Sequence, residues 1–557
     1  MSLIEQARAW IAIDPDPETR RELEALVAND DVAGIEERFS GGLHFGTAGL
    51  RGLLGAGPAR MNRVTVSRAT AGLCAWLKRT VPNAHERGIC IARDARPKSD
   101  VFERDVVEVA AAAGFRVFVF TEMVPTPVLA FSVLRSGSAG GVMITASHNP
   151  PGYNGYKVFW ENGAQIIPPN DTGIAREIEI AAAAEIPRTP LEEARKAGLV
   201  REIDSLRVAY VEAIAERVPV ETRRRPVRIA YTALHGVADL TFREVLARAG
   251  FDDVHSVPEQ AAPDGRFPTV EFPNPEEPGA MDLVLALGEK VGADLVVAND
   301  PDGDRVAVAA RSRNGFETLS GNDLGILLAD DLLAHGDRGS RRVVLSTVVS
   351  SPMLGPVAES HGARWEQTLT GHKWIQNRAI ELEKEGYTYV FGYEEALGYA
   401  VSPLVRDKDG ISAALRIADL ASRLDARGET LLDARDELFR KHGFYADRQV
   451  SVRYEGADAQ ARMKAVVDRL RRAPPRTIGG LRVMRTTEPD RGVLSFDLEG
   501  GHRAMLRPSG TEPKLKHYFY AVGRVTPDAD LDDVKTATFA LLDRIVDDLM
   551  RVTGREG

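Results

Sequence analysis

The sequence predicts an α/β protein with three similar α/β domains, whose sheets are mixed and mostly parallel, and a C-terminal α+β domain, all around a central cleft. The length of 557 residues is enough for roughly three or four domains. A pattern of apolar strands and helix-like segments occurs three times in the same order. From about Phe444 onward the pattern changes to shorter strands, a helix at 457–472 and a final helix.

Each copy of the pattern opens with an apolar strand, continues through a helix-like segment to a second strand, and ends in a third strand with a polar loop. Short connections between such elements are typical of a parallel sheet covered by helices. Three copies in succession therefore predict three domains of similar topology. The opening strands lie at 88–97, 226–236 and 341–351, and the closing strands with their loops lie at 141–150, 293–305 and 387–399.

Two segments are candidates for joints between the copies: the arginine-rich stretch 221–226 and the loop 311–318. The three unusual polar loops all follow the carboxyl ends of their strands, where parallel sheets bind ligands. If the domains face one another, these loops converge on one cleft. We expect domains at 1–205 (with an N-terminal helical extension), 206–315, 316–440 and 441–557.

Composition limits the class of protein. The apolar fraction of 44% and the charged fraction of 27% are ordinary for a globular chain. Cys74 and Cys90 cannot build a disulfide framework, which fits the reducing cytoplasm. The N-terminus reads as an amphipathic helix, with no apolar stretch of a signal peptide or a membrane span. The net charge of −10 argues against nucleic acid, and a phosphate ligand would need local clusters of Arg and Lys.

Three aspartates alternate in the loop DPDGDR that follows an apolar strand: Asp300, Asp302 and Asp304. Carboxylates packed this closely repel one another unless a cation neutralises them. Oxygen ligands select Mg²⁺ or Ca²⁺, and Arg305 and Arg311 stand where an EF-hand needs glycine and glutamate. A magnesium site completed by a phosphate oxygen explains the loop better than a capped acidic turn does.

A rival interpretation of the same loop is a phosphatase that uses an aspartate as its nucleophile. Asp300 would then be phosphorylated, and Asp302 would serve as the acid. This alternative gives no role to the polar loops elsewhere in the chain, so it ranks second.

The loop TASHNP, from Thr145 to Pro150, ends the closing strand of the first copy. Its serine, Ser147, can serve as a nucleophile or a phosphate carrier, although the glycines of a nucleophile elbow are absent. A plain polar turn explains the hexapeptide equally well. Lys157 lies on the strand that follows, where a lysine alone reads as a surface charge.

Two further regions carry groups suited to sugar hydroxyls. The loop GYEEALGY contains Glu394 and Glu395, and carboxylates accept hydrogen bonds from vicinal hydroxyls. The start of a helix is the plain alternative for this loop. The segments TGHKWI, at 370–375, and RDKDG, at 406–410, add imidazole, ammonium and glycine nearby.

The last domain contains the loop RPSGTEPK between two strands. Arg507 offers a guanidinium fork, while Ser509, Gly510 and Thr511 offer two hydroxyls and a flexible backbone. This set suits a phosphate dianion. A hairpin turn is the simpler alternative, but the number of donors favours phosphate binding.

These four loops match, in order, the signature loops of the α-D-phosphohexomutase superfamily. TASHNP resembles its phosphoserine loop, DPDGDR its metal loop, GYEEALGY its sugar-binding loop and RPSGTEPK its phosphate-binding loop. The resemblance runs from FGTAGLRG at 45–52 to HYFYAV at 517–522. The versions of FGTAGLRG, GYEEALGY and TGHKWI in this chain are most similar to those of the phosphoglucomutase-2-like branch.

The resemblance implies an isomerase of the phosphoglucomutase/phosphomannomutase type that carries phosphate on Ser147. It would interconvert glucose 1-phosphate and glucose 6-phosphate through glucose 1,6-bisphosphate, with Mg²⁺ held by the phosphoserine and the three aspartates. Arg51 would stabilise the transferring group, and Lys157 would transfer the proton, with His148 as the alternative. The other expected contacts to the sugar or its phosphates are Arg305, Thr370, Gly371, His372, Lys373, Glu394, Glu395, Lys408, Arg507, Ser509, Gly510 and Thr511.

One position departs from several branches of the superfamily: Ala396 stands where they have serine, which leaves the preferred sugar open. Phosphomannomutase, phosphopentomutase and bisphosphate synthase activities stay open, as do an Asp-dependent sugar phosphatase and a non-catalytic binding protein. We expect small-molecule sugar phosphates as partners, with no nucleic acid and no membrane. The sequence is silent on oligomeric state and is compatible with a monomer.

Overall fold

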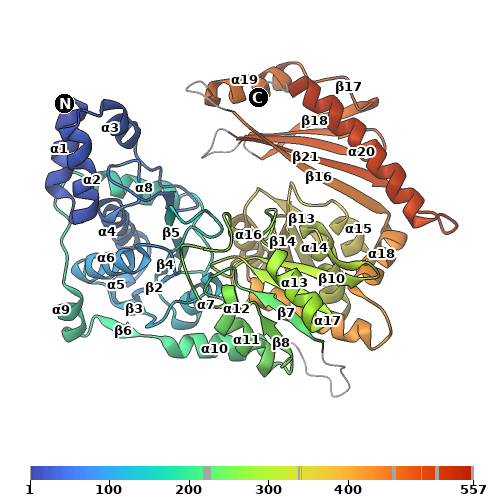
Figure 1. The fold of residues 1–557 in the computed structure, drawn as a ribbon, viewed down its shortest axis with the longest axis horizontal. Coiled ribbons are helices and arrows are strands. Elements are labelled where there is room, and N and C mark those ends of the chain that lie inside the picture. Colours follow the sequence, from blue (N-terminus) through green and yellow to red (C-terminus); the bar gives the residue numbers. More distant parts are fainter. Residues whose placement is uncertain are drawn as a thin grey trace. The chain divides into compact units, whose positions relative to one another are not determined.

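The computed structural model describes residues 2–217, 227–336, 339, 341–454, 459–490, 492–508 and 514–553 (Figure 1). The chain divides into two compact units, and each is described by itself. The first unit consists of Met1–Leu319 with Ala396–Ala426, and the second of Ser320–Glu395 with Arg427–Gly557.

The first unit begins with three short helices that have a small core of their own. These are α1 (Leu3–Ile13), α2 (Pro17–Ala28) and α3 (Val32–Phe39). Each has a capping side chain at its N-terminus, which supplies an acceptor for backbone N–H groups that lack a partner in the helix. Trp10, Leu23 and Ile35 are buried where the helices meet.

The first sheet has six strands. Four of them are parallel neighbours, and β5 and β1 extend the sheet in antiparallel pairs. In order across the sheet the strands are β1 (Leu50–Leu53), β5 (Tyr153–Trp160), β4 (Gly140–Ile144), β2 (Ile89–Arg93), β3 (Val117–Val119) and β6 (Val200–Glu202). The helices of this region are α4 (Arg63–Thr80), α5 (Ala84–Arg87), α6 (Ser99–Ala112), α7 (Thr126–Ser136), α8 (Asn170–Ala181), α9 (Leu191–Lys196) and α10 (Asp204–Ala215).

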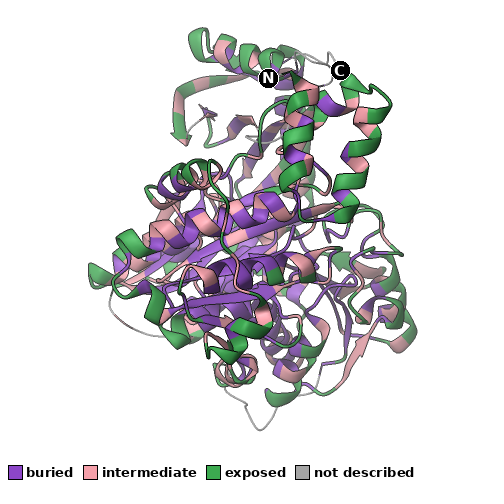
Figure 2. Ribbon diagram, turned by 90° about the vertical axis from the view of Figure 1, so that its left-hand side faces the viewer, coloured by how far each residue is buried: buried purple, intermediate pink, exposed green. Residues whose placement is uncertain are grey.

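The central strands of this sheet form the core of the domain. All five residues of β4 are buried, and Ile89 and Ile91 of β2 are fully buried beside them. Such continuous apolar runs are typical of strands covered on both faces. Figure 2 shows the same contrast in this part of the chain, where the strands are buried and the helices carry both buried and exposed residues.

The second sheet has five strands, of which β7, β8 and β9 are parallel. In order across the sheet they are β11 (Gly315–Thr318), β10 (Val306–Ser312), β9 (Leu295–Asn299), β7 (Ile229–Thr232) and β8 (Val254–Ser256). Its helices are α11 (Asp239–Arg248), α12 (Pro258–Ala261) and α13 (Asp282–Val291). From later in the chain, α17 (Gly410–Asp425) packs against β9 and β10, and the short β15 (Gly398–Ala400) precedes it.

One segment expected as a joint, 311–318, is a hairpin and not a loop. In it, β10 and β11 pair as antiparallel strands at the edge of the second sheet. Gly315 has a φ of 111°, which few residues other than glycine adopt at such a turn. The other expected joint, 221–226, lies outside the described residues.

The second unit contains a parallel sheet in which β12 (Arg342–Thr347) lies between β13 (Arg364–Thr368) and β14 (Thr388–Glu394). Its helices are α14 (Gly321–His335), α15 (Leu354–Ser360), α16 (His372–Lys384) and α18 (Leu431–His442). The helix α14 starts with a capping box, in which Ser320 and Asp323 satisfy each other's backbone N–H groups.

The same unit ends in a six-stranded antiparallel sheet. Its strands in order are β16 (Phe444–Arg453), β21 (Lys514–Gly523), β20 (Arg503–Pro508), β19 (Val493–Leu498), β18 (Leu481–Asp490) and β17 (Thr477–Ile478). The helix α20 (Leu531–Thr553) packs against β16 and β21, and α19 (Ala459–Arg472) precedes β17.

Two α/β regions with mixed sheets, a third in which β12, β13 and β14 are parallel, and a final antiparallel sheet with two helices confirm the predicted α/β domains and the predicted C-terminal α+β domain. Among the described helices, none combines the length and the apolar character that a membrane span requires.

Candidate active site

A loop with three buried carboxylates follows β9 in the first unit. Asp300, Asp302 and Asp304 are each 0% exposed, and one carboxylate oxygen of each lies within 4.8 Å of the others. Gly303 turns the loop with a φ of 71°. Gly236 approaches so closely that an added Cβ would lie 2.4 Å from the Cα of Pro301. The loop after β7 therefore packs tightly against the backbone of the loop that carries the carboxylates.

The oxygens of these carboxylates divide into two sets. Asp302 accepts hydrogen bonds at Oδ2 from Lys157 (2.6 Å) and Thr126 (2.7 Å), and Asp304 accepts one at Oδ2 from Lys157 (2.9 Å). The Oδ1 atoms of Asp302 and Asp304 are buried, and no described residue forms a hydrogen bond with them. Buried oxygens without partners are costly unless a cation binds them. The donor set therefore fits a hard divalent cation such as Mg²⁺.

The charges of this loop are unequal. Burial raises the pKa of Asp300 well above its usual range, and the neighbouring Asp302 and Asp304 raise it further. Burial acts in the same direction on Asp304, but Lys157, Lys408 and Arg305 outweigh it and hold the pKa of Asp304 below its usual range. The loop thus combines a carboxyl that resists ionisation with one that is firmly ionised.

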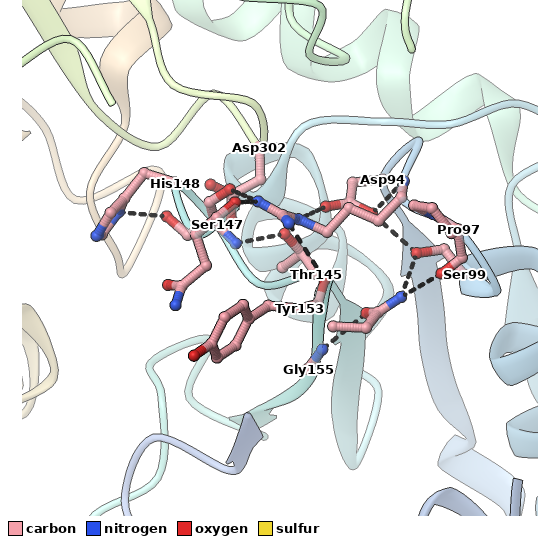
Figure 3. Close-up of polar contacts among 12 residues, drawn as sticks. Asp94, Pro97, Ser99, Thr145, Ser147, His148, Tyr153, Gly155 and Asp302 are labelled. Carbon is pink, nitrogen blue, oxygen red and sulfur yellow. Dashed lines mark hydrogen bonds and ion pairs between the residues drawn. The ribbon is translucent and has the colours of Figure 1, made fainter. Parts of the chain in front are cut away.

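Ser147 reaches this loop from the end of β4. Its hydroxyl donates to Oδ2 of Asp300 at 2.7 Å and lies 3.2 Å from Nδ1 of His148. Ser147 has a φ of 52°, a left-handed conformation that is uncommon for a residue with a side chain. In Figure 3, Ser147, His148 and Asp302 lie at one end of the hydrogen-bonded group of residues that is drawn, and Asp94 and Ser99 lie at the other end.

Two lysines neutralise the carboxylates. Lys157 lies on β5, where the antiparallel register places it opposite Met143 of β4. Burial alone would lower the pKa of Lys157, but Asp302 and Asp304 outweigh burial and raise the pKa above its usual range. Lys408 lies 3.1 Å from Oδ2 of Asp304. Lys157 is therefore protonated. Lys408 contacts the carboxylates, although in sequence it follows the predicted sugar-binding loop closely.

The remaining predicted groups of the first unit surround Ser147. Burial lowers the pKa of His148 well below its ordinary value, and Arg305 and Arg51 lower it further, so the imidazole is neutral. Arg51 donates to the side chain of Asn149 at 3.1 Å. The backbone N–H of Arg305 donates to Oδ1 of Asp300 at 3.0 Å.

The two glutamates of the predicted sugar-binding loop lie in the second unit. Glu394 ends β14 and is 9% exposed, while the carboxylate of Glu395 accepts hydrogen bonds from Thr347 (3.2 Å) and Ser350 (3.1 Å). Burial and, after it, the charge of Glu394 raise the pKa of Glu395 to about 7. The two glutamates thus differ, because Glu395 is committed to hydroxyls of its own domain.

The flanking segment 370–373 begins α16. The backbone N–H of Thr370 donates to Asp490 at 3.0 Å, and the ring of His372 contacts the amide of Gln376 at 3.0 Å. Gly371, with a φ of 114°, and Lys373 complete this helix start.

Arg507 lies on β20 opposite Lys516 of β21, so two cationic side chains sit side by side in the register. Ser509, Gly510 and Thr511 lie outside the described residues.

Three comparisons bear on this arrangement. Family models for the α/β/α domains I, II and III of phosphoglucomutase/phosphomannomutase match residues 42–185, 208–314 and 320–442. The chain belongs to the phosphoglucomutase/phosphomannomutase family. It is thus a phosphosugar mutase of the α-D-phosphohexomutase superfamily, and phosphomutases are isomerases.

Individual relatives of this phosphosugar mutase have several names. A probable phosphoribomutase from Schizosaccharomyces pombe is 36% identical over 95% of this chain and 94% of its own. A probable phosphomannomutase from Haemophilus influenzae is 40% identical over 84% of this chain and 95% of its own. The crystal structure of a putative phosphomannomutase from Thermus thermophilus has a TM-score of 0.69 at 22% identity, covering 92% of this chain and 99% of that one. This last likeness shows the fold.

Three residues of the mutase site were missed by the sequence analysis: Asp94, Arg96 and Thr126. Thr126 begins α7 and holds Asp302 through both its hydroxyl and its backbone N–H. Asp94 and Arg96 follow the first strand in the segment RDARP. One signal was available for this pair, because their loop also follows the carboxyl end of a parallel strand.

Proposed function

We propose that this phosphosugar mutase interconverts glucose 1-phosphate and glucose 6-phosphate by carrying a phosphoryl group on Ser147. The observation that carries the proposal is the hydrogen bond of 2.7 Å from the Ser147 hydroxyl to Asp300 within a buried triad of carboxylates. A phosphate carried on Oγ of Ser147 would therefore lie within reach of a cation bound by the three aspartates. Small sugar phosphates are the proposed partners.

The proposed reaction has two transfers. A hydroxyl oxygen of the sugar monophosphate attacks the phosphorus on Ser147, and the bond between that phosphorus and Oγ breaks. The product is glucose 1,6-bisphosphate, which is both the intermediate and an activator. After the bisphosphate reverses its orientation in the site, Oγ of Ser147 attacks the other phosphate and the isomeric monophosphate is released. Both transfers depend on positioning and on neutralisation of charge.

The three aspartates and the phosphorylated Ser147 are the residues proposed to hold Mg²⁺. When bound, the ion neutralises charge that develops on the transferring phosphoryl oxygens. The orphaned Oδ1 atoms of Asp302 and Asp304 are the observation that supports this ligand set.

Two groups are proposed for proton transfer at the sugar hydroxyl. His148 is neutral and lies 3.2 Å from Oγ of Ser147, so it can accept a proton. Lys157 is protonated by its carboxylate neighbours, so it can donate one. Arg51 and Arg305 are proposed to stabilise the transferring group, since both lie close enough to lower the pKa of His148.

The contacts to the sugar and its non-transferring phosphate are proposed from the family resemblance. Glu394 and Glu395 would accept from sugar hydroxyls, and Glu394 is the better candidate because Glu395 already binds Thr347 and Ser350. The other proposed contacts are Thr370, Gly371, His372, Lys373, Lys408, Arg507, Ser509, Gly510 and Thr511.

A second candidate is the interconversion of pentose 1- and 5-phosphates. The observation that favours it is the near full-length relative from Schizosaccharomyces pombe, named a probable phosphoribomutase. The reacting centre and the phosphoserine are the same in both candidates. Only the residues that contact the sugar ring would decide between them.

The test is a coupled assay with Mg²⁺ and catalytic glucose 1,6-bisphosphate, using glucose, mannose and ribose 1-phosphates in parallel. We expect conversion by the wild type and a fall of at least about a thousandfold in Ser147→Ala, because the nucleophile is lost. The matched control is Ser136→Ala on α7, whose hydroxyl donates to a helix carbonyl in the same domain. Variants Lys157→Met and His148→Asn in the same assay assign the proton transfer.

The outcomes separate the alternatives. The sugar with the highest kcat/KM identifies the substrate, and a preference for ribose replaces the glucose assignment with the pentose one. Full activity in Ser147→Ala would overturn the phosphoserine. Release of inorganic phosphate without isomerisation would favour a phosphatase that uses Asp300. Absence of phosphate on Ser147 by intact mass, with no turnover of any sugar, would indicate a binding protein.

A further inference from the structure

A buried arginine lies under the loop that carries Ser147. Arg96 follows β2 and is 2% exposed, and its guanidinium points to backbone carbonyl groups of the loop rather than to solvent. One nitrogen, Nη2, donates to two carbonyl oxygens, and the other, Nη1, donates to two more. The acceptors are the carbonyls of Ser147 (2.5 Å), Asn149 (2.5 Å), Pro150 (2.8 Å) and Tyr153 (3.2 Å).

These four carbonyls belong to a segment that turns between two strands. Buried carbonyl groups need a hydrogen-bond donor. In a turn, that donor cannot come from the regular backbone hydrogen bonds of a sheet. A guanidinium supplies several N–H donors in a rigid plane, so it can hold several acceptors in one fixed arrangement. The arrangement matters here because Ser147 has a left-handed backbone, which costs free energy unless its surroundings hold it.

Arg96 is itself held on several sides. Asp94 lies 3.2 Å from its Nε, and the Asp94 carboxylate also accepts from the backbone N–H of Arg96 at 3.0 Å and from Ser99 at 2.9 Å. The guanidinium carbon lies 4.9 Å from the ring centre of Phe267. At the backbone of Arg96, Gly265 packs so closely that an added Cβ would lie 2.4 Å from the Cα of Arg96. The guanidinium therefore has little freedom to leave the carbonyls.

We propose that Arg96 is a positioning residue, which fixes the backbone of the Ser147 loop so that the serine hydroxyl meets the carboxylates. Its role rests on the proposed function, because the position of the hydroxyl matters only if Ser147 carries the phosphoryl group. Arg96 touches no reacting atom in this scheme. It acts through the carbonyls on both sides of the nucleophile.

The test compares Arg96→Lys with Arg63→Lys. The lysine at 96 keeps the positive charge but cannot supply a fork to four carbonyls. Arg63 is a matched control, because its guanidinium also donates hydrogen bonds within the same domain. Two of them run from Nη2 and Nε to the carboxylate of the fully buried Asp105, at 2.7 and 2.9 Å. We expect both variants to melt at a lower temperature than the wild type, while only Arg96→Lys lowers kcat, by at least about tenfold, with KM changed less than twofold.

A second measurement does not depend on catalysis. The backbone N–H groups of Ser147, Asn149 and Tyr153 each donate within the loop, so their hydrogen exchange reports its shape. We expect exchange in the peptide 145–155 to accelerate at least about tenfold in Arg96→Lys and to stay at the wild-type rate in Arg63→Lys. This result holds or fails even if the wild type isomerises no sugar, so a failure of the proposed function remains distinguishable.

A second variant guards against misfolding of the first. Asp94→Asn removes the charge that faces Nε of Arg96 but keeps an acceptor for the backbone, and we expect smaller changes of kcat and exchange in the same directions. Equal losses of kcat in Arg96→Lys and Arg63→Lys would overturn the proposal and leave Arg96 a purely structural residue. Unchanged exchange at 145–155 in a folded Arg96→Lys or Asp94→Asn variant would also overturn it.

Discussion

Asp302 uses its two carboxylate oxygens for different purposes. Oδ2 accepts from Lys157 and from Thr126, while the buried Oδ1 has no hydrogen-bond partner among the described residues. A carboxylate held at one oxygen cannot rotate freely, so its other oxygen points in a fixed direction. Residues behind metal ligands commonly orient them in this way. Thr126 is thus expected to matter for metal binding although it offers the cation no charge.

The variant Thr126→Val tests this role with little change of shape. It removes the hydroxyl that donates to Asp302 at 2.7 Å and keeps a side chain of similar volume. We expect Mg²⁺ to bind about tenfold more weakly, as measured by calorimetric titration of the protein and by the Mg²⁺ concentration that gives half-maximal activity.

Thr126→Ser is the control, because it keeps the hydroxyl and loses only a methyl group. Wild-type Mg²⁺ affinity in Thr126→Val would contradict the expected orientation of Asp302. Weaker binding in both variants would assign the effect to packing of Thr126, which is fully buried.

At the scale of elements, the strand pattern predicted much of the site. The closing strands of the first two copies end beside Ser147 and Asp300, as expected from loops at the carboxyl ends of parallel strands. The contacts of Arg96 and Thr126 could not be predicted, because they join residues 51 and 176 positions apart. Periodicity describes the faces of an element but not which distant loop meets its end.

A carboxyl between two elements of the second unit should make its stability depend on pH. Asp447 lies on β16; burial and the charge of Asp323 on α14 raise its pKa to about 7, although a hydrogen bond with Asn322 lowers it. Between about pH 4 and pH 7, Asp447 is therefore protonated in the folded state. In the unfolded chain it has lost this proton, because an exposed aspartate has a pKa of about 4. It follows that stability falls as pH rises from about 4 to 7.

Asp447→Asn removes this titration. We expect the variant to exceed the wild type in free energy of unfolding by about 2 kcal/mol at pH 8, with a much smaller difference at pH 4.5. Urea unfolding at the two pH values measures it. Asp532→Asn is the control, since that side chain is 91% exposed and the change of charge is the same. A difference that does not change with pH would refute the titration of Asp447.

At the scale of the whole molecule, the net charge of −10 has to be reconciled with anionic substrates. The answer in the first unit is local: Arg51, Lys157, Arg305 and Lys408 lie around Ser147 and the carboxylates. In the second unit, Arg507 and Lys516 are neighbours in the antiparallel sheet. Short-range charge of this kind acts at contact distances, where the field of the remaining surface is screened by salt.

The division of the chain into two compact units leads to a last prediction. Each unit has separate cores, such as the cluster around Trp10 in the first and the cluster around Leu345 in the second. Units with their own cores unfold as partly independent cooperative blocks. We therefore expect calorimetric unfolding of the full chain to resolve into two transitions.

Two core variants assign these transitions. Trp10→Ala loses an aromatic contact with Phe39 and a cation–π contact with Arg68, and Leu345→Ala leaves a cavity beneath a fully buried strand position. Either change should cost about 3 kcal/mol in its own unit. We expect Trp10→Ala to lower one melting temperature and Leu345→Ala the other. A single transition that both variants shift equally would show that the chain unfolds as one block, because cooperativity would then extend across every core.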